Sequence, residues 1–184
     1  METTWQQDLE KAIAYHGHLC GGQVLGVRMA KYGLMRLGLE QGTELRDLVV
    51  FLESDRCIAD AVYVITGVTL GSRRVKVMPY GKTAMSFLDL NTGRAIRLTV
   101  KVKDRAPKGA DLVEFWSRYD DEDLLDCREV EINLPPEERP GKPQFVTKCD
   151  RCGDEIIDRR EVVQGGRTLC RACLDGSYYK VIGA

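Results

Sequence analysis

Both histidines of the chain and one of its seven cysteines stand within five residues of one another, in the segment Tyr-His-Gly-His-Leu-Cys-Gly-Gly at 15–22. Imidazoles and thiols are costly to bury without partners, and flanking glycines let a ligand come close to the backbone. The segment therefore indicates a chemical site rather than packing. If it continues as a helical turn, His16 and Cys20 face the same way, and if it is extended, His18 and Cys20 do so.

A nitrogen and a sulfur presented together are typical ligands of zinc or of another borderline-soft divalent ion. A third ligand is needed, and Cys57 is our candidate because we expect it at a helix start, where a thiol pKa is lowered. Asp60 is expected to accept a hydrogen bond from an imidazole or to act as a fourth ligand. Two other interpretations stay open, a packing motif with hydrogen-bonded histidines and a Cys/His nucleophilic site. The candidates for any chemistry are His16, His18, Cys20 and Cys57.

A second set of ligands consists of two Cys-x-x-Cys pairs separated by seventeen residues. This spacing is typical of structural zinc sites, because two tight turns that each present two thiolates complete a tetrahedron. Two disulfides or a redox pair are the alternatives, and the odd cysteine count and lack of a recognisable export signal disfavour them. We expect structural Zn²⁺ at Cys149, Cys152, Cys170 and Cys173, supplying most of the folding free energy of a small unit.

The segment that carries these cysteines, residues 148–175, contains six basic and six acidic residues. Nucleic acid is normally bound by a net positive surface, so we expect the finger to contact protein instead. A turn signal at 164–167, between Ile-Ile at 156–157 and Thr-Leu at 168–169, predicts a hairpin between the two ligand pairs. The adjacent tyrosines 178 and 179 offer a surface for a protein contact.

Helices are expected on both sides of the His/Cys loop. Residues 5–15 and 23–39 have apolar side chains at helical spacing, and Thr4 is a plausible N-cap for the first helix. The nearly all-apolar run 47–52 predicts a central strand that is buried on both faces. A third helix is expected over 57–65, so that Cys57 lies where a strand passes into a helix.

The rest of the core is expected to complete a sheet. Alternating segments at 74–80, 83–90 and 94–103, separated by turn residues, predict an antiparallel meander. A helix is expected at 111–119 and a last strand at 127–134. Five strands with helices on their faces make an α+β or mixed α/β domain.

Composition and a proline-rich stretch indicate two domains. The hydrophobic fraction is 43%, and 27 Lys and Arg residues nearly balance 28 acidic ones, so no general attraction to nucleic acid or membranes is expected. A stiff, proline-rich stretch predicts a core at 1–134, a linker at 135–147 and a zinc-finger domain at 148–184. With no long apolar run and no signal peptide recognised, we expect a cytoplasmic protein.

Four core segments, 16–22, 53–61, 66–71 and the Tyr-Gly-Lys turn at 80–82, together resemble the FmdE family, which takes its name from a component of formylmethanofuran dehydrogenase. The resemblance implies a thioredoxin-like α+β core with a mixed five-stranded sheet, and a C-terminal treble-clef zinc finger. It also implies a metal site at His18, Cys20 and Cys57, with His16 beside it. Relatives commonly have Thr-Gly-Cys-Thr where this chain has Val68, which implies one sulfur ligand fewer in that site.

The same resemblance implies association with a molybdenum or tungsten enzyme of one-carbon metabolism, related to methanogenesis. We therefore expect a metal-binding accessory protein, a non-catalytic subunit whose core holds a second Zn²⁺, another divalent metal or a small cofactor, and whose finger docks a protein partner. A zinc-finger transcriptional regulator and a stand-alone metal-dependent enzyme are the alternatives. A homodimer is expected, because the stiff linker would let the finger reach a second copy of the chain.

Overall fold

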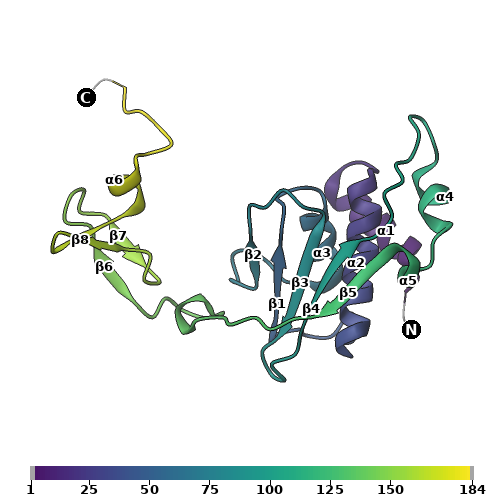
Figure 1. Cartoon of the computed structure of the whole chain (residues 1–184), viewed down its shortest axis with the longest axis horizontal. Helices are drawn as coiled ribbons and strands as arrows, with labels where there is room; N and C mark the ends of the chain where they lie inside the picture. The colour runs from purple at the N-terminus through teal and green to yellow at the C-terminus, as the bar shows by residue number, and fades with distance from the viewer. Residues whose placement is uncertain (1–2, 183–184) are drawn as a thin grey trace. The chain divides into compact units, whose positions relative to one another are not determined.

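A five-stranded mixed sheet is the framework of the first of two units, Met1–Asn133, in a computed structural model that describes residues 3–182. The sheet order is β2-β1-β3-β4-β5, and β1 pairs parallel with β2 while the other pairs are antiparallel (Figure 1). The expected mixed five-stranded sheet is thereby confirmed. The strands are β1 (Leu48–Leu52), β2 (Val75–Val77), β3 (Ala84–Asp89), β4 (Ala95–Val100) and β5 (Leu125–Glu129).

The strand order corrects the predicted meander. β2 does not pair with β3, because β1 lies between them and pairs with both. The reason is the helix between β1 and β2: a crossover of this length returns the chain parallel to β1, whereas a short turn would have returned it antiparallel. The central position expected for β1 is confirmed, and the turn between β3 and β4 closes at Gly93 with φ of 74°. β5 begins two residues before the expected strand.

Three helices group against the sheet, namely α1 (Trp5–His16), α2 (Gly21–Leu37) and α3 (Ile58–Thr66) (Figure 1). Thr4 caps α1 as expected, in a reciprocal capping box with Gln7. Two short helices, α4 (Leu112–Ser117) and α5 (Asp121–Leu124), occur in the chain segment that connects β4 to β5.

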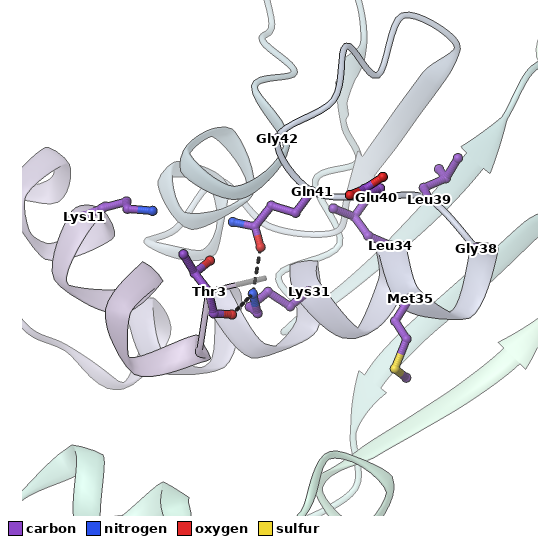
Figure 2. Close-up of a pocket in the computed structure, with 10 residues that line it drawn as sticks. All are labelled: Thr3, Lys11, Lys31, Leu34, Met35, Gly38, Leu39, Glu40, Gln41 and Gly42. Carbon is purple, nitrogen blue, oxygen red and sulfur yellow. Dashed lines mark hydrogen bonds between the residues drawn. The ribbon is translucent and has the colours of Figure 1, made fainter. Parts of the chain in front are cut away.

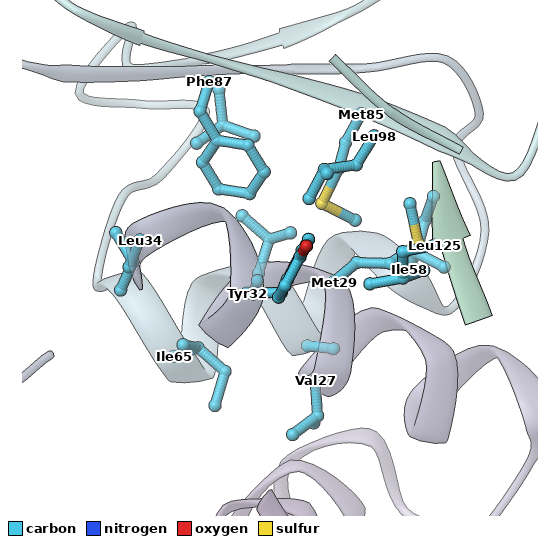
Figure 3. Packing of buried hydrophobic residues seen from close by; sticks show 14 of the residues in the cluster. Val27, Met29, Tyr32, Leu34, Ile58, Ile65, Met85, Phe87, Leu98 and Leu125 are labelled. Atoms are coloured by element: carbon cyan, nitrogen blue, oxygen red, sulfur yellow. The ribbon is translucent and has the colours of Figure 1, made fainter. Parts of the chain in front are cut away.

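Side chains from the strands and the helices fill one continuous core. Figure 3 shows Met85, Phe87 and Leu98 pointing from the strands toward the helices, and all three are fully buried. Glycines let the layers approach closely: a Cβ on Gly33 would lie 2.5 Å from the ring of Phe87. A Cβ on Gly26 would lie 2.7 Å from that of Ala61, so α2 and α3 are in close contact there.

The described residues of the second unit, Leu134–Ala184, form a 3₁₀ turn, two small hairpins and one short helix. Among its described residues, the apolar cluster is small and consists of Cys149, Ile156 and Leu169. The turn predicted at 164–167 is present between β8 and β9, but β7 pairs with β6 and not with β9 as expected. The elements are a 3₁₀ turn (Pro136–Glu138), β6 (Val146–Lys148), β7 (Glu155–Ile157), β8 (Val162–Gln164), β9 (Arg167–Leu169) and α6 (Arg171–Asp175).

No helix among residues 3–182 has the length and apolar character needed to cross a membrane.

Candidate metal centres

Three helix ends meet at the first candidate centre. His16 is the last residue of α1, while Cys20 and Cys57 are the N-cap residues of α2 and α3. Their ligand atoms all lie within 4.8 Å of one another, and His16 Nε2 is 4.0 Å from Cys20 Sγ. The structure therefore brings the expected Cys20 and Cys57 together with a histidine.

Asp60, in the first turn of α3, orients that histidine. The Oδ2 atom of Asp60 lies 2.7 Å from Nδ1 of His16, whose side chain is only 15% exposed. Because a carboxylate accepts hydrogen bonds, the ring donates from Nδ1 and presents the lone pair of Nε2 toward Cys20. This is the arrangement in which an outer carboxylate fixes the tautomer of a metal-binding imidazole.

His18 lies beside this cluster. Gly17 ends α1 in the left-handed conformation, with φ of 93°, and turns the chain out of the helix. The exposed ring of His18 lies beside that of His16, with a centroid separation of 4.5 Å and an angle of 37° between the ring planes. The sequence predicted His18 as the ligand and His16 as its neighbour. In the structure, His16 is the histidine that gathers with Cys20 and Cys57. A ligand role for His18 stays a prediction.

The glycine pair at the start of α2 makes room for the two thiols. A Cβ on Gly22 would lie 2.9 Å from Cys57 Cβ, and 3.6 and 3.7 Å from the Sγ atoms of Cys57 and Cys20. Gln23 was not expected here, and its fully buried amide donates from Nε2 to the Cys57 carbonyl at 2.7 Å. In the sequence, the feature that could have indicated this role is the polar side chain of Gln23 at the start of an otherwise apolar helical face.

The thiol of Cys57 differs from our expectation. Burial, followed by the neighbouring Cys20 thiol, raises the pKa of Cys57 above its ordinary value. This direction is opposite to the lowering expected at the α3 N-terminus, because burial disfavours the charged thiolate. A bound cation would reverse this balance, since a coordinating thiol is deprotonated.

Val68 is remote from this centre. It is fully buried in the hydrophobic core and follows Gly67, the C-cap of α3, whereas Cys57 is the N-cap. Nine helical residues at about 1.5 Å per residue separate the two ends by about 14 Å. Val68 therefore follows the end of α3 that is opposite to Cys57, and the effect of Val68 on the ligand set stays a prediction.

The three donors fit a divalent metal. In tetrahedral zinc sites, with Zn–S near 2.3 Å and Zn–N near 2.0 Å, donor atoms lie about 3.5–3.8 Å apart. Inward shifts of about 1 Å would bring the donors of His16, Cys20 and Cys57 to that spacing. The missing Cβ of Gly22 leaves space for such a shift, and three protein ligands leave one position open.

The second centre is the four-cysteine cluster of the finger. Cys149, Cys152, Cys170 and Cys173 place their Sγ atoms within 4.8 Å of one another. Cys152 Sγ and Cys170 Sγ are 3.9 Å apart, close to the edge of about 3.8 Å expected for a ZnS₄ tetrahedron. Backbone N–H groups of Cys152 and then Cys170 lower the pKa of the Cys149 thiol to about 6. The cluster thus matches the expected structural zinc site.

A pocket of about 540 Å³ in the core unit has none of the candidate metal ligands in its lining (Figure 2). Lys31 reaches into it from α2, but its ammonium is committed to the backbone oxygen of Thr3, to Asp8 Oδ2 and to Gln41 Oε1, each at 2.7 Å. These bonds tie the start of the chain to α2 and to the loop after it. We assign this pocket a structural role.

Comparison with protein families identifies the core. Residues 15–158 match the family described as "FmdE, Molybdenum formylmethanofuran dehydrogenase operon". The chain belongs to the FmdE family. Residues 144–179 of this FmdE protein also match the prokaryotic dksA/traR C4-type zinc finger, so the four clustered cysteines lie in a recognised C4 finger. The expected family and finger are confirmed.

Two individual relatives are informative. The FmdE protein is 29% identical over 206 aligned positions to a "Probable S-adenosyl-L-methionine-binding protein" of Archaeoglobus fulgidus, an alignment that covers 95% of this chain and 54% of the relative. The chain thus spans about half the length of this curated relative. A crystal structure of a tungsten formylmethanofuran dehydrogenase FmdE-like protein from Syntrophus aciditrophicus superposes with a TM-score of 0.63 at 23% identity, over 97% of this chain and 96% of that one. This likeness supports the fold.

Proposed function

We propose that the core of this FmdE protein binds one divalent metal ion, zinc or another borderline-soft ion, through His16, Cys20 and Cys57. The observation that carries the proposal is the convergence of the three donors within 4.8 Å, with the His16 ring fixed by Asp60. A site with three protein ligands keeps a fourth position for water or a small cofactor, which structural zinc sites lack. A metal there would act as a Lewis acid toward a bound ligand.

Metal content per chain tests this proposal. Protein purified anaerobically without chelator should contain two ions per chain, one in the finger and one in the core. Cys57→Ala should contain one ion, while Cys127→Ala, a half-buried thiol outside both clusters, should keep two. One ion in the wild type and one in Cys57→Ala would refute the core site.

We further propose that the protein is an accessory, non-catalytic subunit for a molybdenum or tungsten enzyme of one-carbon metabolism, and that its finger docks a protein partner. The family description and the tungsten enzyme after which the superposed protein is named support this role. The balanced charge of the finger and the exposed rings of Tyr178 and Tyr179 favour a protein surface over nucleic acid.

Affinity capture from native, anaerobic cells tests the accessory role. Recovery of a molybdenum or tungsten enzyme supports it, and recovery of promoter DNA would favour the zinc-finger regulator instead. A stand-alone metal-dependent enzyme would show a turnover that Cys57→Ala abolishes. The thioredoxin-like class of the core, the treble-clef class of the finger, the cytoplasmic location and the homodimer stay predictions, and light scattering would measure the last.

A further inference from the structure

A second hollow of the core unit borders Cys57. It has a volume of about 340 Å³ and lies beyond the carboxyl ends of the parallel strands β1 and β2, a common position for ligands in α/β sheets. The backbone N–H of Lys82 donates to the Glu53 carbonyl at 3.0 Å and holds the loop after β2 against the end of β1. The hollow is lined by Gly22, Leu25, Ser54, Asp55, Arg56, Cys57, Ile58, Gly81, Lys82 and Thr83.

Ser54 is a polar group in this lining that lacks a partner. The residue is 6% exposed, and its hydroxyl makes no hydrogen bond to any residue that the structure describes. Its oxygen is free to form a hydrogen bond with a group inside the pocket.

The surrounding charges indicate that this group is an anion. Arg56 and Lys82 line the pocket, and neither forms an ion pair with another of residues 3–182. Asp55 supplies one opposing charge, so the cations outnumber the anion. The N-terminus of α3, a helix of nine residues, also faces this region, and the side chain of its N-cap Cys57 accepts no capping hydrogen bond. The positive end of a helix dipole favours an anionic ligand.

We propose that this pocket binds the carboxylate or phosphate group of a small molecule. Ser54, Arg56, Lys82 and the first turn of α3 hold the anionic group. Because Cys57 belongs both to the pocket lining and to the three gathered donors, the remainder of the ligand lies next to the open position of the core metal. This last step rests on the proposed metal site, whereas anion binding does not.

Titration with inorganic phosphate and, separately, with acetate tests the proposal on the full chain. In nitrogen-15 correlation spectra, a binding anion should shift the amide signals of Ser54, Arg56, Ile58 and Lys82 saturably at millimolar concentrations. Lys82→Ala and Ser54→Ala should each weaken binding about tenfold, since each removes a group that holds the anion by charge or by a hydrogen bond. Lys103→Ala, which removes an exposed charge outside the lining, should bind as the wild type does.

A second readout uses the thiol itself. With the core metal stripped, the bound anion should slow alkylation of Cys57 by iodoacetamide and leave Cys127 unaffected. Saturation by phosphate or by acetate supports the proposal and distinguishes the two sources of the anionic group. Unmoved amides with both anions, or equal losses in Lys103→Ala and Lys82→Ala, overturn it.

Metal analysis separates this test from that of the proposed function. Ser54→Ala and Lys82→Ala should both retain two ions per chain, because neither residue belongs to a ligand cluster. Two ions without anion binding would refute the pocket alone, and anion binding with a single ion would refute the core metal alone.

Discussion

One carboxylate determines which nitrogen of His16 is free to bind a metal. Asp60 accepts from Nδ1 at 2.7 Å and leaves Nε2 facing Cys20. In Asp60→Asn the amide no longer supplies a charge that fixes this tautomer and strengthens the imidazole as a ligand. We expect a loss of about 10–100-fold in affinity for the core metal. Competition with a chromophoric chelator measures it.

The finger provides an internal reference for that measurement. Its four thiolates do not involve Asp60, so the affinity of the finger metal should be unchanged in Asp60→Asn. Asp123→Asn, an exposed carboxylate outside both clusters, is the matched variant and should leave both affinities unchanged. Wild-type affinity of the core site in Asp60→Asn would show that this contact only supports packing.

Residue types and spacings in the sequence were sufficient to identify the four-cysteine cluster and the two thiols of the core cluster. Cys20 and Cys57 were expected together because a thiol after a glycine turn and a thiol at a helix start are sites where ligands gather. The choice between His16 and His18 was not accessible, because it depends on the left-handed turn at Gly17 between them. The remoteness of Val68 follows from the length of α3, which a linear motif does not convey.

At the scale of elements, the packing of α2 on α3 sets the distance between Cys20 and Cys57. Gly26 lies at this contact, and a Cβ there would lie 2.7 Å from Ala61 Cβ and 3.0 Å from Ile58 Cα. Gly26→Ala should therefore push the helices apart and reduce the free energy of unfolding by about 1–3 kcal/mol. Urea unfolding measures the change.

Gly21→Ala is the control for this substitution on the same helix. A Cβ at Gly21 meets only Trp116 Nε1 within 4 Å, at an ordinary 3.8 Å, so the free energy of unfolding should change by less than about 0.5 kcal/mol. Equal losses in the two variants would mean that loss of glycine, and not the close helix contact, is responsible.

Asp8 joins α1 to α2 and makes stability depend on pH. Burial would raise its pKa, but hydrogen bonds from Lys31, Thr3 and Lys11 outweigh burial and lower the pKa from 3.8 to about 2. The stabilisation is therefore complete above pH 3.8 and is lost as the pH falls toward 2. At 1.36 kcal/mol per pKa unit it amounts to about 2 kcal/mol.

Asp8→Asn isolates this contribution. Between pH 3.8 and 2, the unfolding free energy should fall in both proteins, but the fall should be about 2 kcal/mol smaller in the variant than in the wild type. The other carboxyl groups contribute equally to both proteins and cancel in this comparison. Denaturant unfolding at a series of pH values supplies the comparison. Parallel pH profiles for the two proteins would exclude an effect of the Asp8 ion pairs.

The types of the elements could be predicted from local patterns, but their pairing could not. Period and length indicated a helix at 57–65 and a strand at 47–52, and both are present with shifted ends. The three alternating segments after them looked equivalent, and only the crossover through α3 places the first beside β1. In the finger, β7 pairs with β6. Most of β6 lies in the stretch that was expected to be linker, so this pairing was not predicted.

For the whole molecule, the two units differ in what stabilises them. The core unit buries a large apolar cluster around the sheet, whereas the described finger cluster has three buried residues, Cys149, Ile156 and Leu169, with Cys170, Cys173 and Leu174 packed against them. Such a small core cannot offset the entropy of ordering its chain, so the metal must supply the difference. Structural zinc contributes about 10–16 kcal/mol in finger peptides.

Removal of metal should therefore unfold one unit and leave the other folded. After treatment with a strong chelator, amide signals of residues 148–175 should collapse to unfolded positions, while those of β1 to β5 keep their dispersion. Cys152→Ser should reproduce this state without chelator, because it breaks the finger tetrahedron and spares His16, Cys20 and Cys57. If the sheet of Cys152→Ser unfolded together with the finger, the core would depend on the finger for its stability, and the metal would then support the whole chain.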